Sequence, residues 1–223
     1  MGIPQEMPAT VGVMRTVLAS ASPARRALLE RAGITPVVRA SDVDEAAVER
    51  AARTADPALS PAGLVVALAR AKGEHVASSY RGSPEAALVL ACDSVLQVGD
   101  EVVGKPHTPE VAVARWREMR GGTGTLHTGH WLHDLRTGRS VAAAAATELR
   151  FADLSDDEIE RYVATGEPLH VAGAFTIDGL GSPFVEVVAG DAGTVIGLCL
   201  PLLRRMTLEL GVGWFDLVDP PDA

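Results

Sequence analysis

The segment Leu18-Ala-Ser-Ala-Ser-Pro-Ala-Arg-Arg-Ala-Leu-Leu29 decides how the first part of this chain folds. A short apolar run leads into it, Ser22 is a favourable helix N-cap, and Pro23 suits the first helical position. The helix is expected to run to Gly33, because glycine commonly follows the last helical residue. The segment therefore predicts a strand, a short turn and a helix.

The charge of the first helical turn is unusual. The unpaired N–H groups there carry partial positive charge and favour acidic side chains, yet the turn holds Arg25 and Arg26. Each misplaced cation costs about 0.3–1 kcal/mol unless an anion lies nearby. Together with the hydroxyls of Ser20 and Ser22, the arginines indicate a phosphate-binding site at a strand-to-helix junction. The alternative is that both arginines point into water.

Composition restricts the class of protein. A length of 223 residues allows one large domain or two small ones, and 47% apolar with 22% charged residues is typical of globular chains. The net charge of −9 argues against a broad surface for nucleic acid or a membrane, so an anionic substrate would need a local basic pocket. No apolar run of membrane-spanning length occurs, and residues 1–14 lack the features of a signal peptide.

The two cysteines, Cys92 and Cys199, lie far apart and have no paired spacing. This disfavours metal or redox chemistry by thiols and fits a reducing cytoplasm.

Strand and helix patterns alternate along the chain. Strands are expected over residues 15–19, 37–40, 87–92, 95–98, 101–103, 126–135, 140–151, 172–177 and 184–188. Helices are expected over residues 23–33, 61–79, 109–119, 155–166 and 201–210. This order predicts an α/β or α+β fold with a mixed sheet. The tails, residues 1–14 and 213–223, are expected to be loosely held.

Lysine is rare in this chain. Of the 20 lysine and arginine residues only Lys72 and Lys105 are lysines, which suggests that a compact, mobile ammonium matters at these positions. Lys72 shares an i+4 row with three apolar residues, so it either extends to the rim of a buried helix face or points into a cleft. Lys105 lies between Gly104 and Pro106 in extended backbone, where the alternative is a solvated loop lysine.

Three acidic residues follow predicted strands. Asp93 ends the most apolar strand, at the kind of position where open α/β sheets bind ligands, and is interpreted as a metal ligand or base rather than a loop cap. Glu45 and Asp44 lie in a polar turn after residues 37–40; taken alone, Glu45 is interpreted as solvated.

Several common motifs are missing from the sequence. It has no Gly-x-x-x-x-Gly-Lys-Ser/Thr loop, no Gly-x-Gly-x-x-Gly fingerprint after a strand, and no Gly-x-Ser-x-Gly elbow. His127, His130 and His133 are evenly spaced, but odd spacing on a strand places neighbouring members on opposite faces, which disfavours a zinc site.

An ordered set of segments resembles the Maf proteins, nucleoside triphosphate pyrophosphatases once known as septum-formation inhibitors. The set spans about residues 15–210. Its members are Leu18-Ala-Ser-Ala-Ser-Pro23, Asp44-Glu45, Leu68-Ala-Arg-Ala-Lys72, Cys92-Asp-Ser94, Gly104-Lys-Pro106, Thr128-Gly129, Tyr162 with Gly166-Glu-Pro168, Ala172-Gly173 and Val195-Ile-Gly-Leu198.

The resemblance implies a fold, an assembly and a reaction. The fold is a mixed, twisted α/β sheet with flanking helices and two lobes around a cleft, similar to inosine triphosphate pyrophosphatases. Residues 15–212 would form a single catalytic domain, usually in a homodimer. The reaction is hydrolysis between the α- and β-phosphates of a nucleotide, which gives a nucleoside monophosphate and pyrophosphate.

The resemblance also implies roles for the candidate residues. Asp93 matches the catalytic aspartate and acts as base, metal ligand or both. With Glu45 it would hold Mg²⁺ or Mn²⁺, since oxygen ligands and phosphates suit hard ions. Lys72 and Lys105 would neutralise the triphosphate and the departing pyrophosphate. Phosphate oxygens would be bound by Ser20, Ser22, Arg25 and Arg26.

This chain departs from the two branches of the family. One branch, acting on dTTP and UTP, carries Ser-Pro-Arg-Arg, Ala-Asp-Thr and a glutamine where this chain has Asp178. The other branch, acting on 7-methyl-GTP, carries Ser-Pro-Trp-Arg-Arg and Ser-Asp-Gln. Here the segments are Ser22-Pro-Ala-Arg-Arg26 and Cys92-Asp-Ser94. Ser94 and Asp178 are therefore expected to contact the substrate, and the preferred base stays open among a pyrimidine, 7-methylguanine and a broad range.

Two other classes of function stay open. One is a non-catalytic, nucleotide-binding regulator of cell division. The other is a phosphatase that releases orthophosphate one group at a time. Turnover separates the first from a pyrophosphatase, and product identity separates the second.

Overall fold

The computed structural model describes residues 13–80 and 88–220, and within them seven strands and seven α-helices. The strands are β1 (Thr16–Leu18), β2 (Val37–Val38), β3 (Leu88–Val98), β4 (Glu101–Val103), β5 (Thr123–Asp134), β6 (Ser140–Phe151) and β7 (Val185–Ala189). The α-helices are α1 (Pro23–Arg31), α2 (Glu45–Ala55), α3 (Pro61–Ser78), α4 (Pro109–Met119), α5 (Asp156–Ala164), α6 (Ala192–Ile196) and α7 (Leu200–Glu209). Short 3₁₀ helices cover Glu167–His170, Ala172–Ala174, Ser182–Phe184 and Trp214–Asp216.

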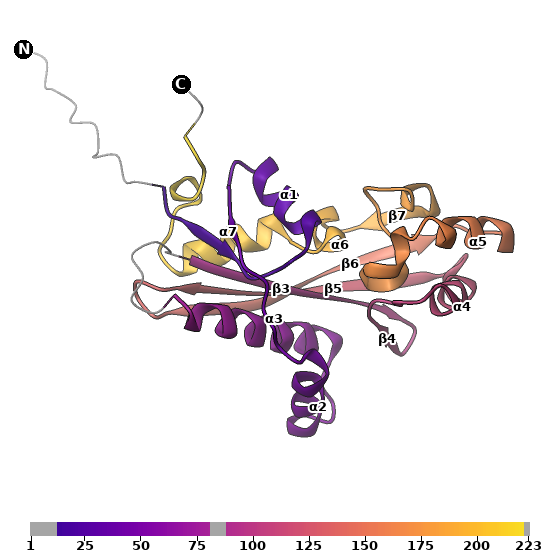
Figure 1. The fold of residues 1–223 in the computed structure, drawn as a ribbon, viewed down its shortest axis with the longest axis horizontal. Coiled ribbons are helices and arrows are strands. Elements are labelled where there is room, and N and C mark those ends of the chain that lie inside the picture. Colours follow the sequence, from indigo (N-terminus) through magenta and orange to yellow (C-terminus); the bar gives the residue numbers. More distant parts are fainter. Residues whose placement is uncertain (1–12, 81–87, 221–223) are drawn as a thin grey trace, which may run out of the picture.

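The strands form one mixed sheet, as the sequence predicts (Figure 1). Its order is β2-β1-β3-β5-β6-β7, with β4 paired to one end of β3. β1 runs parallel to β2 and β3, and the remaining pairs are antiparallel. The α/β fold class is therefore confirmed.

Alternation along β3 assigns its side chains to the two faces of the sheet. Leu90 and Cys92 pack into the cluster that α1 and α7 complete. Val89 and Ala91 pack on the opposite face, against α3. Because successive residues of a strand point to opposite faces, Asp93 lies on the α3 face and Ser94 on the α1 face. Figure 1 shows α3 below the sheet and α1 and α7 above it.

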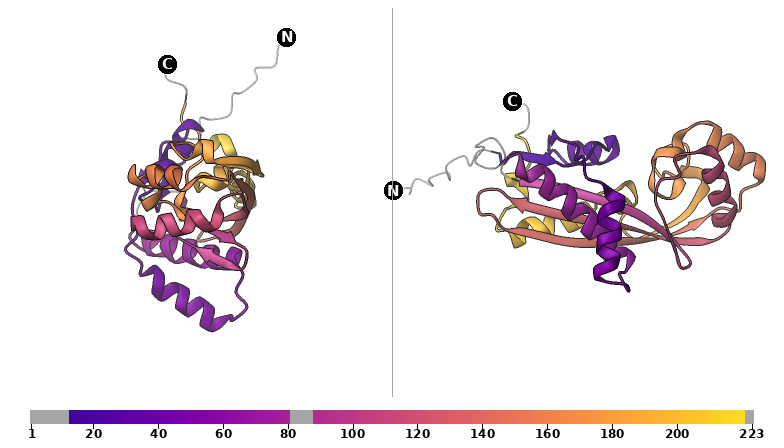
Figure 2. Two further views of the ribbon diagram at one scale, coloured as in Figure 1. Left: turned by 90° about the vertical axis from the view of Figure 1, so that its right-hand side faces the viewer. Right: turned by 60° about the horizontal axis from the view of Figure 1, so that its bottom comes forward.

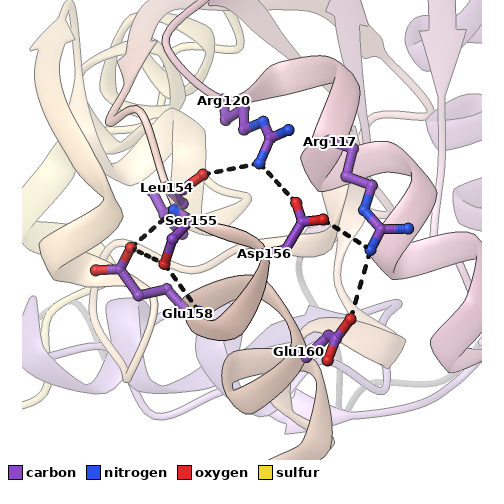
Figure 3. Close-up of polar contacts among 7 residues, drawn as sticks. All are labelled: Arg117, Arg120, Leu154, Ser155, Asp156, Glu158 and Glu160. Atoms are coloured by element: carbon purple, nitrogen blue, oxygen red, sulfur yellow. Dashed lines mark hydrogen bonds and ion pairs between the residues drawn. The ribbon is translucent and has the colours of Figure 1, made fainter.

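The far halves of β3, β5 and β6 carry a second lobe with its own core, visible on the right of the second view in Figure 2. Trp116 of α4 is fully buried there. Figure 3 shows how polar contacts hold α5 against α4: Arg120 Nη1 donates to Leu154 O at 3.0 Å and to Asp156 Oδ1 at 2.7 Å, and Arg117 pairs with Asp156 and Glu160. Ser155 caps α5 through the predicted capping box.

Two predictions near the cleft are wrong. The strand predicted to end at residue 92 continues as β3 to Val98, since β5 pairs along it, with Gly129 opposite Asp93. Residue 87, where that prediction begins, lies outside the described residues. Glu45 is the first residue of α2 rather than part of a polar turn, because Asp44 caps that helix by accepting from the Ala47 amide.

Three more differences concern the C-terminal half. Residues 172–177 do not form a strand: Gly173 and Ala174 have φ values of 75° and 64°, which break an extended chain. Helix α6 was not expected. Residues 213–220 are not loosely held, because the Met14 amide donates to Asp216 O, and the Asp219 amide donates to Gly33 O. Residues 1–12 and 221–223 of the two tails lie outside the described residues.

No helix in the described part of the chain is long and apolar enough to cross a membrane.

Candidate active site

A cleft of about 700 Å³ lies between the two lobes. Its walls come from the β1–α1 turn, α2 and α3 on one side, and from β4 and residues 170–178 on the other. The floor is the middle of β3. There, β1 pairs only as far as Leu90 and β4 pairs only from Leu96, so one edge of β3 is open between them. The cleft follows from this gap in the sheet.

Lys72, Asp93 and Glu45 meet in the cleft. Lys72 Nζ lies 2.5 Å from Asp93 Oδ1 and 2.9 Å from Glu45 Oε1. The side chains of Lys72 and Asp93 are 12% and 11% exposed, whereas that of Glu45 is 57% exposed. Of the two alternatives that the sequence left open for Lys72, the rim of a helix face or a cleft, the structure has the cleft. Three different elements, α3, β3 and α2, supply the three charges.

Burial controls the protonation of Asp93. It raises the pKa of this carboxyl above its ordinary value, although the positive charges of Lys72 and Arg25 oppose the shift. A carboxylate with a raised pKa accepts a proton more readily, and such groups are typical of catalytic sites.

Arg25 is held by protein atoms. Its Nε donates to Gly197 O at 2.8 Å, and Nη1 donates to Cys92 O at 2.9 Å and to Ser20 Oγ at 3.1 Å. Nη2 donates to Ser94 Oγ at 3.0 Å. The sequence predicts an anion near this side chain; in the structure, carbonyl and hydroxyl oxygens of the chain itself accept from four of its five N–H groups.

Ser20 and Ser22 present hydroxyls at the start of α1. Ser20 Oγ accepts from the Ser22 amide at 3.2 Å, and Ser22 Oγ accepts from the Arg25 amide at 3.4 Å, as expected of an N-cap. Both serines line the cleft.

Two further predicted residues line the cleft from the opposite lobe. Lys105 follows β4, and Asp178 lies on the exposed loop after residues 172–174. Lys105 has no hydrogen bond or ion pair with any described residue, so its ammonium is available to a ligand. Asp178 lies at the mouth of the cleft, beside Thr176 and Ile177.

Arg26 does not lie with the other candidates. Its Nε pairs with Glu30 Oε1 at 2.7 Å one turn further along α1, and its side chain is 57% exposed. Neighbouring helical residues point about 100° apart, so a helix that directs Arg25 toward β3 turns Arg26 outward. The alternative noted from the sequence, an arginine in water, holds for Arg26 alone.

Comparison with known proteins agrees with this geometry. The family model described as Maf-like protein matches residues 15–210. The chain belongs to the Maf family. It is 51% identical over 208 residues to a protein of Streptomyces coelicolor named nucleoside triphosphate pyrophosphatase, covering 93% of this chain and 96% of that relative. Proteins with the same name from Leifsonia xyli (50% identity over 207 residues, 92% and 96% coverage) and Thermosynechococcus vestitus (51% over 201 residues, 90% and 96%) are similarly close.

Two residues of this Maf chain that support the lining of the cleft were not singled out from the sequence. Thr128, which is fully buried in β5, lies directly opposite Ser94 of β3, and their two hydroxyl oxygens are 2.8 Å apart. Glu167 accepts four hydrogen bonds, from the Tyr162 and Thr176 hydroxyls and the Leu180 and Gly181 amides, and so holds the loop that carries Asp178. The available signals were Thr128-Gly129 and Gly166-Glu-Pro168, two of the segments that resemble the Maf family.

Two buried residues of the Maf chain, His130 and Cys92, are uncharged at neutral pH. His130 accepts from the Cys199 amide at 2.9 Å, and burial, aided by the charge of Arg25, lowers its pKa to about 4. Burial raises the pKa of Cys92 to about 12, so its thiol is protonated at neutral pH. Among the described residues, no group of three or more His, Cys, Asp or Glu side chains could hold a metal ion by itself.

Proposed function

We propose that this chain is a hydrolase acting on acid anhydrides, a nucleoside triphosphate pyrophosphatase. It would cleave the bond between the α- and β-phosphates and release a nucleoside monophosphate and diphosphate. The buried ion pair of Lys72 with Asp93, in a cleft also lined by serine hydroxyls, carries the proposal. The name shared by relatives at about 50% identity supports it.

In this mechanism the triphosphate is bound from both lobes. The hydroxyls of Ser20 and Ser22 donate to phosphate oxygens at the start of α1. Lys72 and Lys105 approach from opposite walls of the cleft and neutralise the charge that develops on the departing diphosphate. Because they come from separate elements, the phosphates of the substrate would draw the lobes together.

Asp93 is the group that orients or deprotonates the attacking water. Its Oδ1 is paired with Lys72, whereas Oδ2 has no hydrogen bond from a described residue and is available to a water molecule. The raised pKa that burial gives Asp93 favours proton acceptance at this atom. Lys72 keeps the carboxylate charged and oriented until the proton moves.

The residues fit a divalent cation shared with the substrate. Glu45 and Asp93 meet at one ammonium, so their second oxygens lie in the same part of the cleft. Mg²⁺ is commonly held by one or two carboxylates together with substrate phosphates and water. Glu45 and Asp93 would hold Mg²⁺ or Mn²⁺ in this way, and the ion would add charge stabilisation at the phosphates.

The nucleoside half of the substrate would lie toward Ser94 and Asp178. Since Asp178 replaces the glutamine of the branch acting on dTTP and UTP, a standard pyrimidine is not the default expectation, and modified or non-standard nucleotides belong in any substrate panel. We also infer a homodimer in the cytoplasm, which light scattering and fractionation would test.

Product analysis tests the proposal. Wild-type protein and Asp93→Asn would be incubated with standard and modified nucleoside triphosphates and Mg²⁺ or Mn²⁺. Asp157→Asn is the matched control, because Asp157 pairs with Arg161 on the exposed surface of α5. Diphosphate and monophosphate from wild type and the control, at least 100-fold slower in Asp93→Asn, are expected. Orthophosphate as the first product would indicate another phosphohydrolase, and binding without turnover would indicate the regulator.

A further inference from the structure

Arg25 contacts two serines that line the cleft, and the first of them has a fixed hydrogen-bonding direction. Ser20 Oγ accepts from the Ser22 amide and from Arg25 Nη1. A hydroxyl has two acceptor lone pairs and one proton. Both lone pairs of Ser20 are therefore engaged, and its proton is the part left for a ligand. Ser20 faces the cleft as a donor.

The second serine, Ser94, has the opposite direction. Thr128 Oγ1 lies 2.7 Å from Thr194 O, and a carbonyl can only accept, so the single Thr128 proton is used there. Ser94 must then be the donor in its 2.8 Å contact with Thr128. Arg25 Nη2 occupies one Ser94 lone pair. One lone pair is left, and Ser94 faces the cleft as an acceptor.

We propose that these hydrogen bonds orient the substrate, with its phosphates at Ser20 and its nucleoside at Ser94. Thr128 is a positioning residue that never touches the ligand. An ionised phosphate oxygen can only accept, so it fits Ser20 and is repelled by Ser94. Ser94 instead recognises a hydrogen-bond donor on the nucleoside, either a sugar hydroxyl or a ring N–H. This assignment rests on the proposed function, because it takes the substrate to be a nucleotide.

The chain offers matched variants for the test. Thr128→Val keeps the shape of the side chain and removes the hydroxyl, whereas Thr128→Ser keeps the hydroxyl. Thr147→Val is the control for lost stability: Thr147 is also buried and donates to a carbonyl of the same segment, Asp191 O at 2.9 Å, but has no contact with Ser94. All four proteins would be compared with the parent nucleotide, which is the triphosphate of the substrate panel that the wild type binds most tightly, and with its ring-N-methyl, 2′-deoxy and 3′-deoxy analogues.

Diphosphate release gives kcat/KM, and calorimetric titration without divalent metal gives Kd for the same four nucleotides. In the wild type, one analogue should be about tenfold weaker than the parent nucleotide, which identifies the donor as the ring N–H or one sugar hydroxyl. Thr128→Val should bring the ratio between the parent nucleotide and that analogue, in kcat/KM and in Kd, closer to one. Without the Thr128 hydroxyl, Ser94 can rotate and is no longer restricted to accepting a hydrogen bond. Thr128→Ser and Thr147→Val should keep the ratio of the wild type.

Three results would overturn the inference. The first is an unchanged ratio in Thr128→Val, and the second is a reduced ratio in Thr147→Val as well. The third is equal activity and equal affinity of the wild type for all four nucleotides, which would assign the Ser94 lone pair to water. Binding with the expected ratios but no turnover would refute the pyrophosphatase and leave the inference standing.

Discussion

Gly129 allows α3 to lie directly against β5, and replacing it with alanine should disable the site. A Cβ atom at Gly129 would be 2.3 Å from the carbonyl carbon and oxygen of Val65, whereas ordinary contact begins at 3.4 Å. Those are backbone atoms and cannot rotate away, so α3 must move off the sheet by about 1 Å. Lys72 follows Val65 by two helical turns and would be drawn away from Asp93 with it.

The expected cost of Gly129→Ala is about 1–3 kcal/mol of unfolding free energy, because the core is overpacked. A misplacement of about 1 Å also lowers catalysis by about 100-fold. Urea unfolding and the rate of diphosphate release measure the two effects. Gly124→Ala, in the same strand but under the second lobe, has its closest contacts at 3.1 Å and should lose stability while keeping kcat. Folded Gly129→Ala protein with wild-type kcat would refute the reasoning.

Three further outcomes follow from the structure. Lys72→Met should lower kcat by about 100- to 1000-fold while Lys72→Arg retains part of it, measured as diphosphate release. Glu167→Gln should speed amide exchange at Leu180 and Gly181 at least about tenfold, since an amide group cannot accept from four donors; unchanged exchange in mass-spectrometric measurements would contradict this. His130 has a folded pKa of about 4, below the ordinary value near 6.5, so the unfolded chain binds the proton first. Unfolding free energy should therefore fall by about 3 kcal/mol as pH drops from about 6.5 to about 4, and His130→Gln should flatten that decline in urea titrations.

Local signals predicted most of the helices correctly. Ser22, Ser60, Thr108 and Ser155 each cap the helix that follows, and a proline occupies the first turn after three of them. Caps act within one turn, so their residues are visible in a short stretch of sequence. The i+4 row placed Lys72 on the buried face of its helix, but it left open whether the ammonium reaches the rim or a cleft. The mixed sheet followed from the order of these elements.

The surroundings of Asp93 could not be predicted from its neighbours in sequence. A buried carboxylate inside a central strand is unfavourable unless a partner satisfies it, and that partner, Lys72, comes from α3. Glu45, which pairs with the same ammonium, comes from α2. Gly129 on the paired strand leaves room for α3 to bring Lys72 there. Helix α2 was missed for a different reason: none of its residues is buried, and its apolar face consists of alanines and one valine, which is a weak signal in the sequence.

Arg25 was predicted as a phosphate ligand from the sequence around it alone, and its surroundings in the fold add a second role. A cation in the first turn of a helix suggested a bound anion, but two carbonyls and two hydroxyls take four of the five N–H groups of Arg25. The open edge of β3 explains this, since the Cys92 carbonyl has no strand partner on that side and needs a donor. The Arg25 guanidinium therefore supplies the hydrogen bond that a neighbouring strand would otherwise donate to Cys92 O. In doing so it also orients the serine hydroxyls that face the cleft, so the unusual charge arranges other groups of the site. One N–H group of Arg25, which lines the cleft, has no hydrogen bond to a described residue.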